Sequence, residues 1–248
     1  MLMRVRNVQM VLPYRYRITT YIYMENKEFT HNGIKLAYAK SGIGQPIIFL
    51  HGNGENNTLF TQIAKQLAQE NFTVFAPDTR SHGQSDTVKR LSYTDMADDV
   101  KALIDYEQIK NPILFGFSDG GITGLTLAIK YPDLLKKLIV AGVNLSPNGI
   151  VCKIRFLIGF AHFFTRSDKL KLMLKQPNIT IEQLKTIQTP TTVYHAQKDI
   201  VKLSHSTAVA ENVQHGKIII LENENHASYV QDNKKLYDLL KTEITEVI

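Results

Sequence analysis

The chain has 248 residues, 44% of them hydrophobic and 21% charged, a composition typical of a globular protein that buries a sizeable core. Its one cysteine, Cys152, excludes an internal disulfide and a cysteine-based zinc cluster, which suits a reducing compartment such as the cytoplasm. The net charge of +6 comes largely from residues 1–23, which hold four arginines and no acid. The remaining 25 basic and 23 acidic residues form no stripe of the kind that binds nucleic acid.

We expect residues 1–26 to be a basic N-terminal extension. Its apolar stretch VQMVLPY is short and is broken by Pro13, so it does not fit a secretory signal. A run of about 20 apolar residues, as a membrane-spanning helix needs, is absent from the sequence, so we expect no stable membrane insertion. A natural start at Met24 and a basic arm that touches a membrane or partner are the alternatives. The oligomeric state is left open.

From residue 27 onward, short apolar segments alternate with longer amphipathic ones. Strands are predicted at 34–42, 46–52, 72–78, 112–117, 137–143, 191–197 and 217–223, and helices at 59–70, 92–107, 120–130, 205–213 and from about 228. Such alternation predicts an α/β protein with a mostly parallel sheet of about eight strands and helices on both faces. One irregular insertion interrupts the pattern at about 145–188.

The segment 116–120 reads Gly-Phe-Ser-Asp-Gly and matches the G-x-S-x-G pattern between a predicted strand and a predicted helix. A sharp strand-to-helix turn would present the hydroxyl of Ser118 as a nucleophile, and small flanking residues would make room for that turn. The alternative is a glycine-rich turn with no chemical role.

A nucleophilic serine needs a base and an acid that orients the base. Asp199 follows the strand at 191–197 and His226 follows the strand at 217–223, so both are expected at the same edge of the sheet as Ser118. Glu222 and Glu224 compete with Asp199 for the acid role, but they lie within four residues of His226. The sequence therefore predicts Ser118, Asp199 and His226 as a catalytic triad.

Two main-chain amides are needed for the developing oxyanion. The N–H of Asp119 begins a predicted helix, and the N–H of Asn53 lies in the segment HGNG at 51–54. A phosphate-binding loop is the alternative for HGNG, but no Lys-Ser/Thr pair follows it. No histidine pair has metal-ligand spacing, so we expect neither a metal nor a cofactor.

The chain resembles the α/β-hydrolase superfamily over residues 27–248. The resemblance rests on FLHGNG, GFSDGG, KDIV, NENHASYV and FAPDTRSHGQSD, the last with Ser81 where the family usually has Gly. It implies a core formed by 27–146 and 189–248 and a short cap formed by 147–188. Family members with dehalogenase or epoxide-hydrolase chemistry usually carry an aspartate nucleophile, which Ser118 argues against.

Within the cap, Phe156, Phe160 and Phe163 are candidates to line a substrate pocket; the alternative is that they pack the cap on the core. Seven basic residues against two acids in the cap leave an anionic substrate or a bilayer contact open. Asp119 could bind a substrate ammonium, as similar elbows in amino-acid-ester hydrolases suggest, or only support the helix start.

We therefore expect a cytoplasmic serine hydrolase of small carboxylic esters or thioesters. The alternatives on the same triad are a C–C bond hydrolase, an amino-acid-ester hydrolase and a small peptidase. The alternative outside the enzymes is a ligand-binding pseudo-hydrolase.

Overall fold

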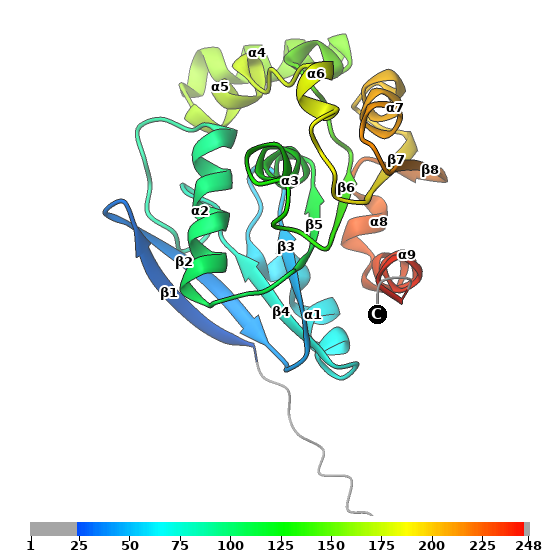
Figure 1. The fold of residues 1–248 in the computed structure, drawn as a ribbon. Helices are drawn as coiled ribbons and strands as arrows, with labels where there is room; N and C mark the ends of the chain where they lie inside the picture. Colours follow the sequence, from blue (N-terminus) through cyan, green and yellow to red (C-terminus); the bar gives the residue numbers. More distant parts are fainter. Residues whose placement is uncertain (1–23, 246–248) are drawn as a thin grey trace, which may run out of the picture.

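The protein forms one eight-stranded, mostly parallel sheet in a computed structural model, which describes residues 24–245. The strand order is β1-β2-β4-β3-β5-β6-β7-β8 (Figure 1). Strands β3 to β8 run parallel, and β2 is antiparallel to both of its neighbours, β1 and β4. The α/β-hydrolase fold class predicted from the sequence is confirmed. The strands are β1 Glu25–His31, β2 Ile34–Ser41, β3 Gln45–Leu50, β4 Phe72–Pro77, β5 Ile113–Phe117, β6 Lys137–Ala141, β7 Thr191–Lys198 and β8 Gly216–Asn225.

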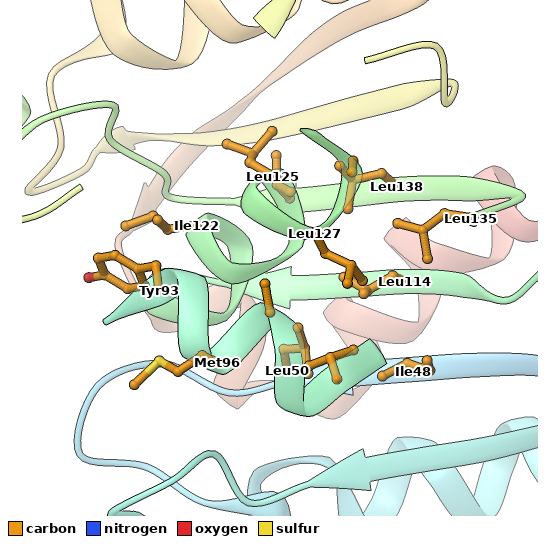
Figure 2. Close-up of a cluster of buried hydrophobic side chains, with 14 of the residues drawn as sticks. Ile48, Leu50, Tyr93, Met96, Leu114, Ile122, Leu125, Leu127, Leu135 and Leu138 are labelled. Carbon is orange, nitrogen blue, oxygen red and sulfur yellow. The ribbon is translucent and has the colours of Figure 1, made fainter. Parts of the chain in front are cut away.

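Helices cover both faces of this sheet because successive side chains of a strand point to opposite sides. The helical elements are η1 Asn57–Phe60, α1 Thr61–Ala68, α2 Tyr93–Tyr106, α3 Asp119–Lys130, η2 Pro147–Gly149, α4 Cys152–Thr165, α5 Asp168–Lys175, α6 Ile181–Leu184, α7 Leu203–Asn212, α8 Ser228–Gln231 and α9 Asn233–Thr245. On β3, Ile48 and Leu50 face α2 and α3, as Figure 2 shows, whereas Ile47 and Phe49 pack in the cluster that includes α1 and α9.

The strand β1 was not predicted, because the first strand expected from the sequence, at 34–42, corresponds to β2. Glu25 pairs with Lys40 at the start of the β1–β2 ladder, so residues 25 and 26 belong to the sheet and not to the extension expected at 1–26. Phe29, in the middle of β1, is buried against Tyr38 of β2, and this contact attaches the strand to the core. Residues 1–23 of that expected extension lie outside the described residues.

The insertion expected at 147–188 falls between β6 and β7 and contains η2, α4, α5 and α6. These helices lie together above the carboxyl ends of the central strands, at the top of Figure 1. Ser167 caps the start of α5, and Thr180 with Gln183 forms a reciprocal capping pair at α6. The insertion is thus made of separate helical segments.

Candidate active site

Ser118 occupies the sharp turn between β5 and α3. Its backbone angles are φ 52° and ψ −117°, a conformation that non-glycine residues rarely adopt. The Ser118 N–H donates to the carbonyl of Ala141 on β6 over 2.8 Å, which holds the turn against the next strand.

The glycines on either side of Ser118 are required by close packing. A Cβ atom at Gly116 would lie 2.4 Å from the carbonyl oxygen of Gly120, and one at Gly120 would lie 2.2 Å from the carbonyl oxygen of Leu50. Larger residues would therefore push the turn away from β3. The G-x-S-x-G pattern reflects the space available at this turn.

His226 lies between β8 and α8 and contacts both other residues predicted for the triad. Its Nε2 is 3.1 Å from Ser118 Oγ, and its Nδ1 is 2.6 Å from Asp199 Oδ1. If Nδ1 donates to the Asp199 carboxylate, Nε2 is left to accept from the Ser118 hydroxyl. The Phe117 ring lies 5.0 Å from the imidazole, centroid to centroid, and restricts its position.

Asp199 follows β7 and its side chain is fully buried. Oδ1 also accepts from the Val201 N–H over 2.9 Å, whereas Oδ2 has no hydrogen-bond partner among the described residues. Burial opposes ionisation of this carboxyl, but the hydrogen bonds from His226 and Val201 outweigh it and hold its pKa below the usual value. Asp199 is therefore a carboxylate at neutral pH.

Asn53 and Asp119, the residues predicted to provide amides for an oxyanion, lie next to each other. Asp119 is the first residue of α3, so its N–H has no carbonyl one turn earlier to bond. The Asn53 N–H likewise has no partner within residues 24–245. The two side chains are joined, because Asn53 Nδ2 donates to Asp119 Oδ2 over 2.9 Å.

Asp119 is buried and both of its carboxylate oxygens are engaged. Tyr93 Oη donates to Oδ1 over 2.9 Å, while Asn53 occupies Oδ2. Burial raises the pKa of Asp119 although these two hydrogen bonds favour its ionised form. This arrangement supports the role of Asp119 in fixing the turn, with one hydrogen bond accepted by each carboxylate oxygen.

The same Asn53 amide also reaches the cap. Its Nδ2 lies 3.2 Å from the carbonyl oxygen of Lys169 on α5. One side chain therefore connects three segments: the loop after β3, the start of α3 and the cap. Sequence reasoning placed Asn53 here only for its main-chain amide. The two residues that its side chain contacts are 66 and 116 positions away in the sequence. A local sequence pattern does not indicate contacts between residues so far apart.

Two further groups hold the loop after β3 and were not predicted. Glu55 Oε2 accepts from the Gly52 N–H over 2.9 Å, and burial raises the pKa of this carboxyl. His51 Nδ1 donates to the Gly52 carbonyl over 2.8 Å, while its Nε2 accepts from the Thr79 N–H over 3.1 Å. The sequence signal that could have indicated this contact is the position of Glu55, an acidic residue three positions after Gly52.

A small hollow lies directly beside Ser118 and His226. Met173 of α5 and Gln176, which follows α5, are among the residues that line it, and its volume is about 10 Å³. The apolar residues that line it are Ile150, Met173, Ile200 and Val201. This hollow has room for little more than the reacting atoms, so a larger substrate requires the cap side chains to rearrange.

The predicted pocket residues Phe156, Phe160 and Phe163 do not line this hollow. They lie on α4, and 73%, 59% and 61% of these residues are exposed to solvent, respectively. The prediction is wrong because α4 packs on α5 through its other face, so that α5 and not α4 covers the site. Helical spacing in the sequence does not show which face of a cap helix turns inward.

Among residues 24–245, no group of three or more His, Cys, Asp or Glu is arranged to hold a metal ion. In the same range, no helix has the length and apolar character needed to cross a membrane.

Comparison with known proteins places the chain in a family. The pattern that defines the alpha/beta hydrolase fold family matches residues 45–168, which include Ser118 and the loop after β3. The chain belongs to this family and is an α/β-hydrolase.

Two curated relatives show how far the similarity extends. The sn-1-specific diacylglycerol lipase ABHD11 of Xenopus laevis is 32% identical over 160 residues, which cover 64% of this chain and 49% of that protein. The serine hydrolase BPHL of Homo sapiens is 28% identical over 226 residues, which cover 79% of this chain and 78% of that protein. The match to the frog lipase thus spans about half of its length.

Solved structures share the fold at low sequence identity. The N-acyl homoserine lactone degrading enzyme Est816 superposes with a TM-score of 0.74 at 20% identity, covering 87% of this chain and 99% of that one. The meta-cleavage product hydrolase of Pseudomonas fluorescens IP01 gives a TM-score of 0.75 at 17% identity, covering 91% and 99%. At these identities the likeness is one of fold.

Proposed function

We propose that the protein is a serine hydrolase that cleaves small carboxylic esters or thioesters through an acyl-enzyme. The observation that carries this proposal is the continuous hydrogen-bonded chain from Ser118 through His226 to the buried Asp199. Such a chain is the arrangement that activates a serine hydroxyl. The division into a core at 25–146 and 189–248 and a cap at 147–188, and a cytoplasmic location, are parts of the same proposal.

Acylation starts at Ser118. The hydroxyl oxygen attacks the substrate carbonyl carbon while His226 Nε2 takes the hydroxyl proton. Asp199 holds the ring through Nδ1 and stabilises the imidazolium that forms, and it remains ionised throughout. His226 then passes the proton to the leaving alcohol or thiol as the bond to the acyl carbon breaks.

The negative charge that develops on the carbonyl oxygen is received by the main-chain amides of Asn53 and Asp119. The Asp119 N–H also lies at the amino end of α3, where the helix dipole favours an anion. Deacylation reverses the proton transfers: His226 takes a proton from water, the water oxygen attacks the acyl carbon, and Ser118 leaves with its proton restored.

The names of the curated relatives support ester chemistry. A diacylglycerol lipase and a serine hydrolase are among them. The amino-acid-ester alternative is weakened because both oxygens of Asp119 are bonded within the protein. Cleavage of a C–C bond or of a small peptide would use the same triad, and comparison of substrates with matched acyl groups separates these reactions.

A fluorophosphonate probe tests the proposal directly, because it phosphonylates an activated serine. We expect labelling of the wild-type protein and none of Ser118→Ala or His226→Ala. Matched controls are Ser204→Ala and His215→Ala, which change exposed residues away from the site and should leave labelling intact. A folded wild-type protein that is not labelled and hydrolyses no p-nitrophenyl ester would overturn the proposal in favour of a ligand-binding protein.

A further inference from the structure

The helix α4 exposes an apolar face that the proposed chemistry does not use. Although α4 has 14 residues, none of them is buried in the part of the chain that the structure describes. Its exposed large apolar residues are Phe156, Leu157, Phe160, Phe163 and Phe164. Half of the exposed large hydrophobic residues between 24 and 245 therefore lie on this one helix, which marks the face as an interaction surface.

The five side chains form one continuous patch. Their spacing of three or four residues places them along one side of the helix. Phe160 and Phe164 lie 4.9 Å apart, and Phe163 and Phe164 lie 5.2 Å apart, centroid to centroid. The half-buried Ile154 and Ile158 fall on the opposite side of the helix, in keeping with its packing on α5. We call the five exposed residues the α4 patch.

Cations border the α4 patch. The guanidinium of Arg166 lies 5.3 Å from the centre of the Phe163 ring, and Lys153 is exposed in the first turn of the helix. The basic residues of the cap are Lys153, Arg155, Arg166, Lys169, Lys171, Lys175 and Lys185. Within residues 24–245 none of them forms an ion pair, whereas many lysines of the core do.

A second group of cations lies beside α5. Arg90, Lys171 and Lys175 line a hollow of about 160 Å³ together with a single acid, Asp168. The end of the molecule that carries the α4 patch therefore combines exposed phenylalanines with an excess of positive charge, and its lysines and arginines form no ion pair within residues 24–245. This combination is the one by which amphipathic helices lie in the interface of an anionic membrane.

We propose that the α4 patch docks the protein on an anionic phospholipid bilayer, with the phenylalanines inserted at the headgroup boundary and the cap lysines and arginines on lipid phosphates and carboxylates. A second copy of the chain is a poorer occupant, because pairing two α4 patches would bring two sets of unpaired cations together. Docking by α4 is peripheral and needs no membrane-spanning segment. It would also bring α5, which covers the hollow beside Ser118, close to the lipid surface.

Vesicle flotation of the full chain tests this proposal without relying on catalysis, since Ser118→Ala can be used throughout. The two vesicle types are pure phosphatidylcholine and phosphatidylcholine mixed with phosphatidylserine. We expect binding to the mixed vesicles to exceed binding to the neutral ones and to weaken as the salt concentration rises. The double variant Phe160→Ser/Phe164→Ser should lose binding by about tenfold or more.

Matched variants distinguish binding by the α4 patch from nonspecific binding by any exposed apolar residue. Ile43→Ser/Ile220→Ser removes two exposed apolar residues far from the cap and should bind as before. Lys153→Gln/Lys171→Gln should lose the preference for phosphatidylserine. Circular dichroism and the urea midpoint of each variant show that it is folded.

Three outcomes would overturn the proposal. One is the absence of flotation with mixed vesicles, and another is equal flotation of the two double serine variants. The third is a dimer in light scattering that Phe160→Ser/Phe164→Ser dissociates while no form binds lipid, which would make the α4 patch a contact between copies.

Discussion

The side chain of Asn53 donates to Asp119 Oδ2 over 2.9 Å and so joins the two residues whose main-chain amides we propose as the oxyanion hole. Loops that meet only through their backbones can drift apart, and amides that stabilise a developing charge must stay close to their productive geometry. The hydrogen bond from Tyr93 to the other oxygen of Asp119 fixes the same carboxylate from α2. Asn53 is thus a positioning residue through its side chain.

We expect Asn53→Ala to lower kcat for an ester substrate by about tenfold with little change in KM, because the main-chain amide is kept but is held less firmly. Steady-state kinetics with a p-nitrophenyl ester measures both constants. The matched control is Asn56→Ala, which removes a side chain that caps η1 in the same loop and makes no contact with Asp119. Equal loss of kcat in both variants would assign the effect to general loosening of the loop.

Gly142 follows β6 with φ 62°, and a Cβ atom there would lie 2.7 Å from His226 Cε1. We expect Gly142→Ala to displace the imidazole and to reduce the rate of fluorophosphonate labelling by about 100-fold, since a shift of about 1 Å is enough for such a loss. The substitution should also cost about 1–2 kcal/mol of stability through the positive φ.

The control variant Gly33→Ala distinguishes the effect of backbone strain from the effect of displacing the His226 imidazole. Gly33 has φ 75° in the β1–β2 turn, and no atom lies within 4 Å of its added Cβ. This control should lose a similar amount of stability in urea unfolding and keep the full labelling rate. Normal labelling of Gly142→Ala would show that the contact with His226 does not limit the reaction.

The sequence analysis expected Ser118, Asp199 and His226 at one edge of the sheet, and the structure brings them within hydrogen-bond distance of one another. Each follows a strand, and parallel strands end at a common edge. The sequence analysis missed Tyr93 and Glu55 because their contacts depend on how α2 and the loop after β3 approach the site.

Ser81 is a different case. It stands where the family usually has glycine, and its φ of 64° shows that the backbone keeps the left-handed conformation that glycine provides. Ser81 thus adopts a backbone conformation that glycine takes more easily.

Two buried histidines should make the protein sensitive to mild acid. Burial lowers the pKa of His51 to about 4 and, with the nearby His51 ring, the pKa of His82 to about 4, against 6.5 when exposed. Between these values the unfolded chain binds more protons than the folded one, so the free energy of unfolding falls as pH decreases from about 6.5 to about 4. We expect each histidine to contribute a loss of about 1–2 kcal/mol between about pH 7 and pH 5.

Urea unfolding at the two pH values measures this loss. His82→Asn keeps a nitrogen donor near the Arg80 carbonyl but does not titrate. The decrease in the free energy of unfolding between the two pH values should therefore be smaller than in the wild-type protein, whatever the stability of the variant at neutral pH. His215→Gln changes an exposed histidine and should leave the loss unchanged. A loss that is equal in all three proteins would mean that other groups account for the pH dependence.

A buried ion pair joins β6 to the C-terminal helix. Lys137 Nζ lies 2.7 Å from Glu243 Oε2, both side chains are almost fully buried, and Thr192 Oγ1 donates to the same carboxylate oxygen over 2.7 Å. Replacing Glu243 by Gln removes the carboxylate charge beside the buried Lys137 ammonium, and we expect this to lower the free energy of unfolding by about 3 kcal/mol. Asp238→Asn breaks the exposed Lys234–Asp238 pair on the same helix and should cost less than about 0.5 kcal/mol. Thermal and urea unfolding of the two variants measures the difference, and equal costs would show that burial does not set the strength of the Lys137–Glu243 pair.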